Sequence, residues 1–282
     1  MRLKFWGVRG SVAAPEANYQ RFGGNTPCVE LRLDAHRSLL LDAGLGLRWQ
    51  ALDMLSRQGV GNELEILLSH CHWDHIQGIP FSPMMYIPGN RILIRGVGQP
   101  PRSLLDNLVE QLRPEFCPVP NFLTQRVGAD IEVRQFGPEP TTDSNGLTIR
   151  HAHLPRCRSP HPVVGYRIEF KGLTLAYLTD VEYAGSPADC SEALQLARGA
   201  DVLIHDAQLL PEERGRPSAA GHSSYLEALE LARLAGVRRL FGFHHDPTRN
   251  DEQLEQLEEL LKRQSSCPAE LAREGQELEL TS

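Results

Sequence analysis

The hexapeptide His70-Cys71-His72-Trp73-Asp74-His75 is the most informative segment of this chain. It directly follows the apolar run Glu65-Ile66-Leu67-Leu68, which is typical of a buried strand. Its imidazoles and carboxylate suit a borderline divalent metal such as zinc. Because side chains alternate along an extended loop, His70 and His72 project to one side, whereas Asp74 and His75 lie across a turn. The spacing therefore favours two neighbouring metal ions over one.

Outward from this motif, strand-like and helix-like segments alternate in two similar halves. Residues 1–137 and 146–282 each read as a β-rich part followed by helices, and the intervening residues are turn formers throughout. Helical periodicity is found at Gly46–Gln58, Ser223–Ala235 and Asp251–Arg263, the last with Thr248 or Asn250 as its cap. Two sheets packed face to face, with helices outside, is the simplest architecture, and we expect one domain spanning residues 1–282.

Composition narrows the class of protein. The chain has 282 residues, 41% of them hydrophobic and 23% charged, which is an ordinary globular mixture. No apolar run approaches the roughly 20 residues needed to span a bilayer. The formal net charge of −7 disfavours a nucleic-acid or membrane-surface binder. The six cysteines are scattered without a CxxC pair, which predicts reduced thiols and a cytoplasmic location.

An HxHxDH motif after a strand resembles the signature of the metallo-β-lactamase-fold hydrolases. The resemblance is to a branch that includes tRNA 3′-processing nucleases and phosphoribosyl cyclic phosphodiesterases. It implies an α/β (α+β) fold, an αββα four-layer sandwich with the metals at one edge. The segments that carry it are Lys4–Leu31, Leu40–Gly44, Asp74–Pro80, Gly165–Ile168, Leu178–Asp180, His205–Gln208, Gly221–Ser224 and Phe243–Pro247.

The same resemblance implies the remaining metal ligands. Asp180 matches the bridging aspartate, and His244 matches the last histidine. The middle histidine precedes Gly-Tyr-Arg-Ile; His161 is our choice, and His153 and His151 are the alternatives. The implied arrangement has one metal on His70, His72 and His161, the other on Asp74, His75 and His244, and Asp180 between them. Zinc is the expected metal, with manganese and iron as alternatives.

The predicted catalytic residues are Asp74, His222 and Asp206. A histidine at the position of His222 serves the family as general acid, and Asp206 is placed to hold that ring in one tautomer. The alternative is that His222 belongs only to a helix-capping loop. Asp42 resembles a carboxylate that orients a ligand histidine, and its alternative is a simple turn residue.

These residues predict an enzyme, a dinuclear metal-dependent hydrolase that uses metal-activated hydroxide on a small, cyclic phosphodiester. The alternatives are a tRNA 3′-processing endoribonuclease, a lactone, thioester or β-lactam hydrolase on the same metals, and a non-enzymatic sensor domain. We expect a small-molecule partner without nucleic acid or membrane, and a homodimer stays open. Trp73 is interpreted as a stacking platform or a wall of the site. Arg156, Arg158 and Arg167 are interpreted as surface salt-bridging residues, with a phosphate contact as the alternative.

Overall fold

The computed structural model describes residues 1–98, 101–117, 119, 121–125, 127–156 and 163–281. The chain forms two compact units. The first comprises Met1–Ala14, Gly23–Phe136 and Arg273–Leu280, and the second is built mainly from Pro15–Phe22 and Gly137–Ala272. Each unit therefore includes a segment from outside the half that the sequence predicted for it. That the whole chain acts as one domain stays a prediction.

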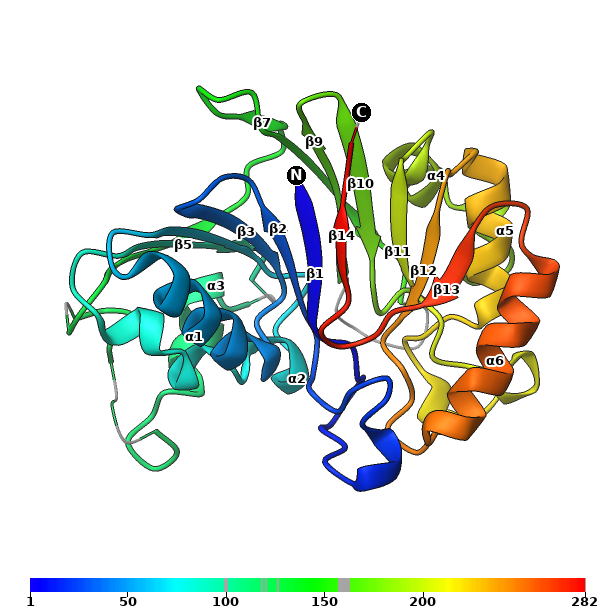
Figure 1. Cartoon of the computed structure of the whole chain (residues 1–282), viewed down its shortest axis with the longest axis horizontal. Coiled ribbons are helices and arrows are strands. Elements are labelled where there is room, and N and C mark those ends of the chain that lie inside the picture. The colour runs from blue at the N-terminus through cyan, green and yellow to red at the C-terminus, as the bar shows by residue number, and fades with distance from the viewer. Residues whose placement is uncertain (99–100, 118, 120, 126, 157–162, 282) are drawn as a thin grey trace. The chain divides into compact units, whose positions relative to one another are not determined.

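The first unit contains a seven-stranded sheet in the order β14-β1-β2-β3-β4-β5-β6. Its strands are β1 (Arg2–Gly7), β2 (Cys28–Arg32), β3 (Arg37–Leu41), β4 (Glu63–Leu67), β5 (Arg91–Gly96), β6 (Asp130–Gln135) and β14 (Glu277–Glu279). Pairing is antiparallel from β14 to β3 and parallel from β3 to β6. The C-terminal β14 lies beside β1 (Figure 1), so both ends of the described chain contribute to this sheet.

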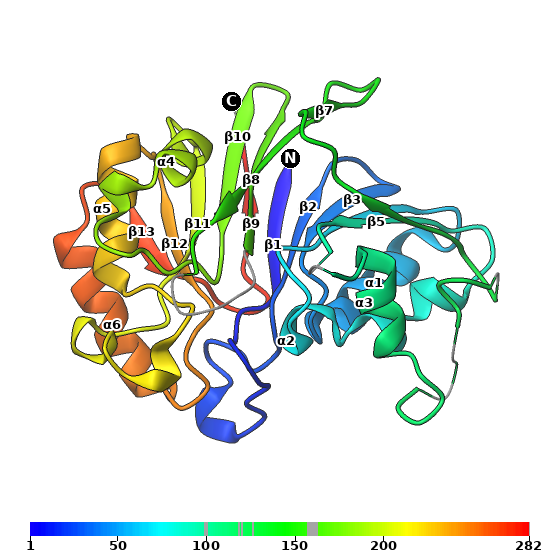
Figure 2. The ribbon, with the colours of Figure 1, turned by 180° about the vertical axis from the view of Figure 1, so that it is seen from behind.

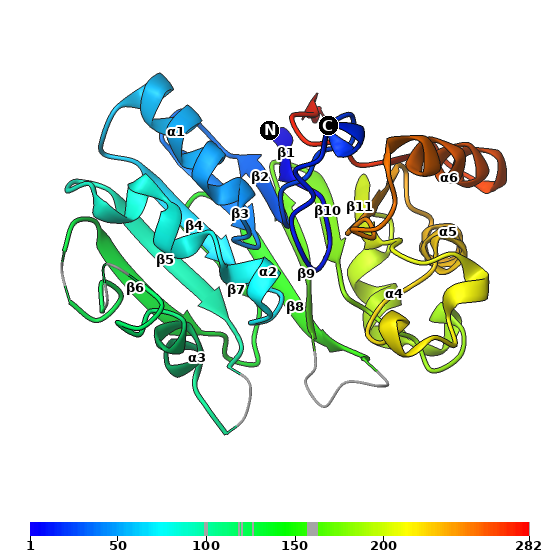
Figure 3. The ribbon, with the colours of Figure 1, turned by 90° about the horizontal axis from the view of Figure 1, so that it is seen from below.

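Helices α1 (Gly46–Gln58), α2 (Trp73–Ile76) and α3 (Leu104–Glu110) lie along this first sheet (Figure 3). The predicted helix at 46–58 is confirmed. Leu47, Ala51 and Met54 recur at helical spacing on α1 and are buried in a core with strand residues such as Ile66 and Ile94. Short 3₁₀ turns η2 (Ile79–Phe81) and η3 (Pro83–Tyr86) follow α2, whereas η1 (Ala17–Tyr19) belongs to the second unit.

The second unit contains the other seven-stranded sheet, in the order β13-β12-β11-β10-β9-β8-β7. Its strands are β7 (Thr141–Thr142), β8 (Thr148–Leu154), β9 (Val163–Phe170), β10 (Leu173–Leu178), β11 (Val202–Asp206), β12 (Leu240–Phe243) and β13 (Ala269–Leu271). Pairing is antiparallel from β7 to β10 and parallel from β10 to β13. The second sheet thus repeats the change from antiparallel to parallel pairing found in the first.

Helices α4 (Ser191–Ala197), α5 (Tyr225–Ala235) and α6 (Asp251–Gln264) cover one side of the second sheet (Figure 2), with α4 against β8 to β10, α5 against β11 and β12, and α6 against β13. Their apolar residues form one core with the sheet. Asn250 caps α6, as one of the two predicted caps, and Ser224 caps α5 with Glu227 in a reciprocal capping box. The predicted helix therefore begins at Tyr225 instead of Ser223. The turns η4 (Pro187–Asp189), η5 (Pro211–Glu213) and η6 (Pro217–Ala219) lie in connecting loops.

Polar residues occupy corresponding strand ends in the two units. Asp42 directly follows β3, the strand at which the first sheet becomes parallel, and Asp180 closely follows β10, its counterpart in the second sheet. His70 comes shortly after β4, and His244 directly follows β12. Carboxyl ends of neighbouring parallel strands share one sheet edge, so each unit gathers its polar residues at such an edge. None of the helices among the described residues is long and apolar enough to cross a membrane.

Candidate metal and catalytic site

The first unit brings His70, His72, Asp74 and His75 together, and we call these residues the histidine cluster. The ring centroids of His70 and His72 are 4.3 Å apart, as are those of His70 and His75. Asp74 and His75 lie in the short helix α2, which begins just after His72, so the turn expected from the sequence is a helical one. Nε2 of His75 lies 3.3 Å from Oδ2 of Asp74. Imidazole nitrogens and a carboxylate oxygen thus lie close together, as a divalent metal requires.

The side chains of Asp42 and Ser69 form polar contacts with residues of the histidine cluster. Oδ2 of Asp42 lies 2.7 Å from Nδ1 of His75, and both side chains are fully buried. Ser69 donates its backbone N–H (2.7 Å) and its hydroxyl (2.8 Å) to the two oxygens of the same carboxylate. The Ser69 hydroxyl also lies 3.0 Å from Nδ1 of His70. Because Nδ1 of His75 is engaged by the carboxylate, its Nε2 is the nitrogen available to a metal.

Asp74 is held by a strained residue near the N-terminus. The backbone N–H of Ser11 donates to Oδ2 of Asp74 at 2.8 Å, and Ser11 has φ of 61°. Non-glycine residues seldom adopt this conformation, which costs of the order of 1 kcal/mol or more and concentrates at functional sites. Asp42 has the same φ of 61°. Two residues that touch the histidine cluster therefore keep a backbone geometry that the fold must impose.

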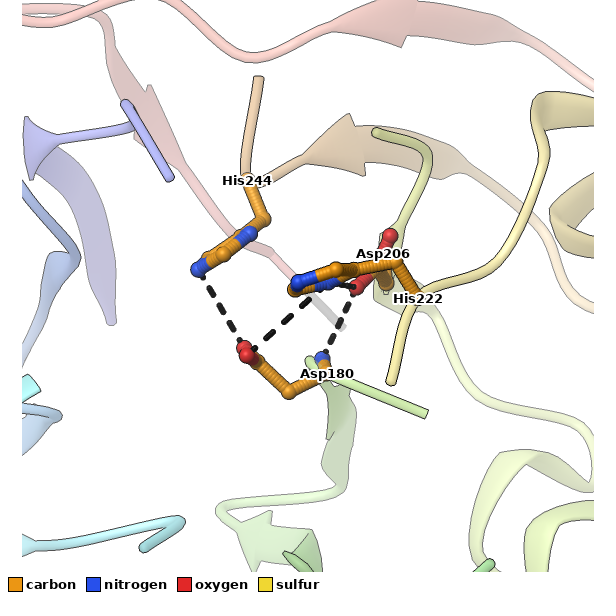
Figure 4. Close-up of side chains that lie close together, drawn as sticks. All are labelled: Asp180, Asp206, His222 and His244. Carbon is orange, nitrogen blue, oxygen red and sulfur yellow. Dashed lines mark hydrogen bonds and ion pairs between the residues drawn. The ribbon is translucent and has the colours of Figure 1, made fainter. Parts of the chain in front are cut away.

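The second unit gathers Asp180, Asp206, His222 and His244, which we call the Asp180 cluster (Figure 4). All four are buried, and their candidate ligand atoms lie within 4.8 Å of one another. Nε2 of His244 is 3.3 Å from Oδ2 of Asp180, and Nδ1 of His222 is 3.9 Å from Oδ1 of Asp180. The rings of His222 and His244 stack with centroids 5.0 Å apart. Buried carboxylates and imidazoles at this density are a donor set that fits a divalent cation.

Asp206 organises this cluster with both of its carboxylate oxygens. Oδ2 lies 2.8 Å from Nδ1 of His222 and accepts the backbone N–H of Asp180 at 3.0 Å. Oδ1 accepts the backbone N–H groups of Gln208 (3.0 Å) and Ser223 (3.3 Å). Because backbone groups fix the carboxylate, it fixes the His222 ring in turn. These contacts hold the Asp206 carboxylate against the His222 ring, and its catalytic role stays a prediction.

Burial and charge oppose each other at His222. Burial lowers the pKa of this imidazole, but the Asp206 carboxylate and its hydrogen bond outweigh that effect, with a further contribution from Asp180. The net result raises the pKa of His222 above its ordinary value. A ring in this environment retains its second proton to higher pH, as a general acid at neutral pH must.

His244 has its own orienting partner in Gln208. Oε1 of Gln208 lies 2.8 Å from Nδ1 of His244, which leaves Nε2 facing Asp180. His244 and Asp180 have φ of 62° and 56°. Left-handed backbone conformations thus occur at strand ends in this cluster as they do at Asp42 in the first unit. His245 turns elsewhere, with Nε2 2.7 Å from the carbonyl oxygen of Ala272.

The donor sets of both clusters fit divalent metals, since each combines imidazole nitrogen with carboxylate oxygen and each has an orienting carboxylate or amide behind its histidines. The choice of middle histidine stays a prediction. His161 lies outside the described residues. The alternative His153 is exposed on β8 and, with Tyr183, lines a cavity of about 460 Å³.

Several contacting residues were not predicted from the sequence. Ser69 and Gln208 are ordinary polar residues whose importance depends on partners distant in the chain, so composition offered no signal for them. Arg156 corrects the sequence interpretation: it is buried, with 6% of its surface exposed, instead of lying on the surface. Arg167, in contrast, forms a salt bridge with Glu169 at 2.9 Å, as predicted, and also donates to the backbone carbonyls of Leu196 and Arg198. Arg158 lies outside the described residues.

Comparison with known proteins agrees with these features. The model of the family described as "Beta-lactamase superfamily domain" matches residues 37–245. A putative ribonuclease Z of Mycobacterium tuberculosis (strain CDC 1551 / Oshkosh) is 35% identical over 132 residues, which cover 45% of this chain and 56% of that protein. The chain thus spans about half the length of these mycobacterial relatives.

Solved structures show the same fold along the whole chain. The metallo-β-lactamase fold protein YhfI from Bacillus subtilis has a TM-score of 0.69 and 22% identity, and 99% of each chain is covered. A diphosphatase from the PhnP family also has a TM-score of 0.69, with 20% identity over 99% of this chain and 98% of that one. The predicted α/β fold class is therefore confirmed.

The family model matches well over half of the chain. The predicted family is confirmed, and the buried His and Asp side chains fit the divalent metals that this fold implies. The protein is a member of the metallo-β-lactamase superfamily.

Proposed function

We propose that this chain is a dinuclear metal-dependent phosphodiesterase that cleaves a small, cyclic phosphodiester. The observation that carries the proposal is the pairing of His222 with Asp206 at 2.8 Å, beside the buried Asp180. Attack of activated water on a phosphodiester expels an alkoxide, and this leaving group departs readily only when it receives a proton. A buried imidazole held in one tautomer supplies that proton.

The proposed ligand set follows from the family motif. His70, His72 and His161 would hold one metal, Asp74, His75 and His244 would hold the other, and Asp180 would be shared between them. Two divalent ions at such a site supply Lewis acidity to the phosphoryl oxygens and lower the pKa of a bound water. Zinc is the proposed metal, because imidazole and carboxylate ligands suit it.

The remaining steps belong to the side chains of the protein. Asp206 accepts a hydrogen bond from Nδ1 of His222 and favours the doubly protonated ring, whose Nε2 proton is the one passed to the leaving oxygen. Asp42 and Gln208 hold the rings of His75 and His244 so that the Nε2 atoms need no reorientation when metals bind. Preorganised groups of this kind lower the cost of reaching the transition state.

Ribonuclease Z activity is the second candidate function. It is favoured by the names of the mycobacterial and archaeal relatives, one of which matches 86% of this chain at 25% identity. These relatives weaken the expectation that nucleic acid is not a partner. The net charge of −7 still favours a small substrate over a polymer with many phosphates.

The test compares substrates on purified protein. We expect about two metal equivalents per chain and hydrolysis of bis(p-nitrophenyl) phosphate that chelation abolishes and added zinc restores. A panel of cyclic nucleotides, cyclic ribose phosphates and precursor tRNA then separates the two functions. Faster cleavage of precursor tRNA would replace the first proposal with the second. If metal-replete protein cleaves no phosphodiester, both fail, and lactones, thioesters and β-lactams are the substrates to examine.

A further inference from the structure

Arg156 is a buried cation next to the Asp180 cluster. It follows β8 by two residues, and only 3% of its side chain is exposed. Its Nη2 lies 3.7 Å from Oδ1 of Asp180. Burying a guanidinium costs several kcal/mol unless charged and hydrogen-bonding partners compensate, and an apolar side chain of similar volume would pack at lower cost. The position of this charge therefore calls for an explanation beyond packing.

The guanidinium packs closely against Gly221, the residue before His222. A Cβ on Gly221 would stand 2.5 Å from Nη2, 2.9 Å from Nε and 3.0 Å from Cζ of Arg156. Gly221 also has φ of +91°, which L side chains rarely adopt. Glycine at this position thus allows both the sharp turn into His222 and the close approach of the arginine.

The side chain of Glu182 holds the same turn by accepting a hydrogen bond from the backbone of Gly221. Its Oε2 accepts the N–H of Gly221 at 2.8 Å. Arg156 and Glu182 face each other in a parallel β-bridge, and the N–H of Glu182 donates to the carbonyl oxygen of Pro155 at 2.9 Å. The bridge therefore joins the segment after β8 to the segment after Asp180. Both of its residues also contact Gly221.

We propose that Arg156 is a positioning residue, whose guanidinium holds Asp180 and the Gly221–His222 turn in register so that His222 reaches the leaving oxygen. It acts through His222 and does not itself touch the substrate. This inference rests on the proposed phosphodiesterase function, because it specifies how the general acid of that site is placed.

The first test is Arg156→Met, which keeps an unbranched, flexible side chain and removes the charge and the planar fork. We expect kcat on a phosphodiester with a poor leaving group to fall about 10- to 100-fold, the size typical of residues that orient reacting groups, with KM changed less than twofold. On bis(p-nitrophenyl) phosphate, whose leaving group needs no proton, the loss should be threefold or smaller. Arg156→Lys should recover part of the activity. Arg167→Met, which removes an arginine bound to helix carbonyls, is the matched control.

A double-mutant cycle separates this role from general support of the fold. In a His222→Ala background, Arg156→Met should cause less than a twofold further loss, because the residue through which it acts is gone. Independent, multiplicative losses would overturn the proposal, as would equal losses on activated and unactivated substrates. Gly221→Ala should reduce activity more in the wild type than in an Arg156→Ala background, where the added methyl group finds space.

A measurement without turnover distinguishes failure of this inference from failure of the proposed function. Amide hydrogen exchange of the peptide that contains Gly221 and His222 should be at least tenfold faster in Arg156→Met than in the wild type or in Arg167→Met, at matched thermal stability. If the wild type cleaves no phosphodiester, the proposed function fails while faster exchange still supports the positioning role. Unchanged exchange overturns the role whatever the activity.

Discussion

Oδ2 of Asp42 lies 2.7 Å from Nδ1 of His75, and the two side chains are completely buried. Asp42 directly follows β3, whereas His75 lies in α2, 33 residues later in the sequence. The pair therefore determines which nitrogen of His75 can face a metal, and it does so from a position that is itself strained, with φ of 61°. In the second unit, Asp206 contacts Nδ1 of His222 in the same way.

Replacing Asp42 by Asn should weaken metal binding. Asparagine tolerates the left-handed backbone, so the change removes the charge without adding strain. We expect a 10- to 100-fold lower zinc affinity, as found when a carboxylate behind a ligand histidine is lost. Competition with a chromophoric chelator measures this affinity. Asp34→Asn, on the exposed turn between β2 and β3, should bind zinc as the wild type does; equal affinities in all three proteins would show that Asp42 does not support the metal.

His222→Ala should slow poor leaving groups more than good ones. General acid catalysis contributes typically 10²–10⁴-fold, and we expect a loss in this range on a cyclic nucleotide but a much smaller one on bis(p-nitrophenyl) phosphate. Asp206→Asn should show the same dependence on the leaving group, because it leaves the ring without its charged partner. His36→Ala, at an exposed position, serves as the control. Losses that do not depend on the leaving group would remove the acid function from His222.

His205 should make the free energy of unfolding depend on pH. Burial lowers the pKa of His205 below its ordinary value, although contacts with Asp206 oppose this. Its Nδ1 lies 2.6 Å from the carbonyl oxygen of Asp206, so Nδ1 carries the proton and Nε2 accepts from the Tyr183 hydroxyl at 2.9 Å. The native ring thus stays neutral at a pH where the unfolded chain is already protonated.

Unfolding consequently takes up a proton as the pH falls below about 6.5, and stability is lost in that direction by up to about 1.4 kcal/mol per pH unit until the native ring also titrates. Urea unfolding at pH 7.5, 6.5 and 5.5 measures the slope. His205→Gln should reduce it, whereas His36→Gln should leave it unchanged. A slope that is the same in all three proteins would mean that His205 is protonated in the native state as readily as in the unfolded one.

Trp73 should contribute to binding of aromatic substrates. It lies between His72 and Asp74 in the histidine cluster, yet 55% of its surface is exposed. Stacking of a base on an aromatic ring is worth about 1–3 kcal/mol, so Trp73→Ala should raise KM for a cyclic nucleotide about fivefold or more. KM for a cyclic ribose phosphate, which has no base, should not change. Trp49 on α1 is exposed to 50% and is the matched control for loss of a surface tryptophan.

Local chemistry explains why much of the fold could be predicted. The helix at Gly46–Gln58 and the cap at Asn250 follow from apolar periodicity and from a side chain that satisfies the first free N–H groups, both of which are properties of neighbouring residues. The start of α5 was misplaced by two residues because Ser223 and Ser224 are both good caps. Only the partner Glu227, three residues further on, selects Ser224.

The candidate site likewise has a part that the local sequence predicts and a part that it does not. His70, His72, Asp74 and His75 are close in sequence, so their spacing alone indicated a metal site. The pairings of Asp42 with His75, Gln208 with His244 and Arg156 with Gly221 join residues far apart in the chain. No local pattern encodes them, because they arise only when separate strands end at the same sheet edge. The amino-acid order therefore specified the donor atoms, while tertiary packing decided which nitrogen of each ring is presented and which charges are buried beside it.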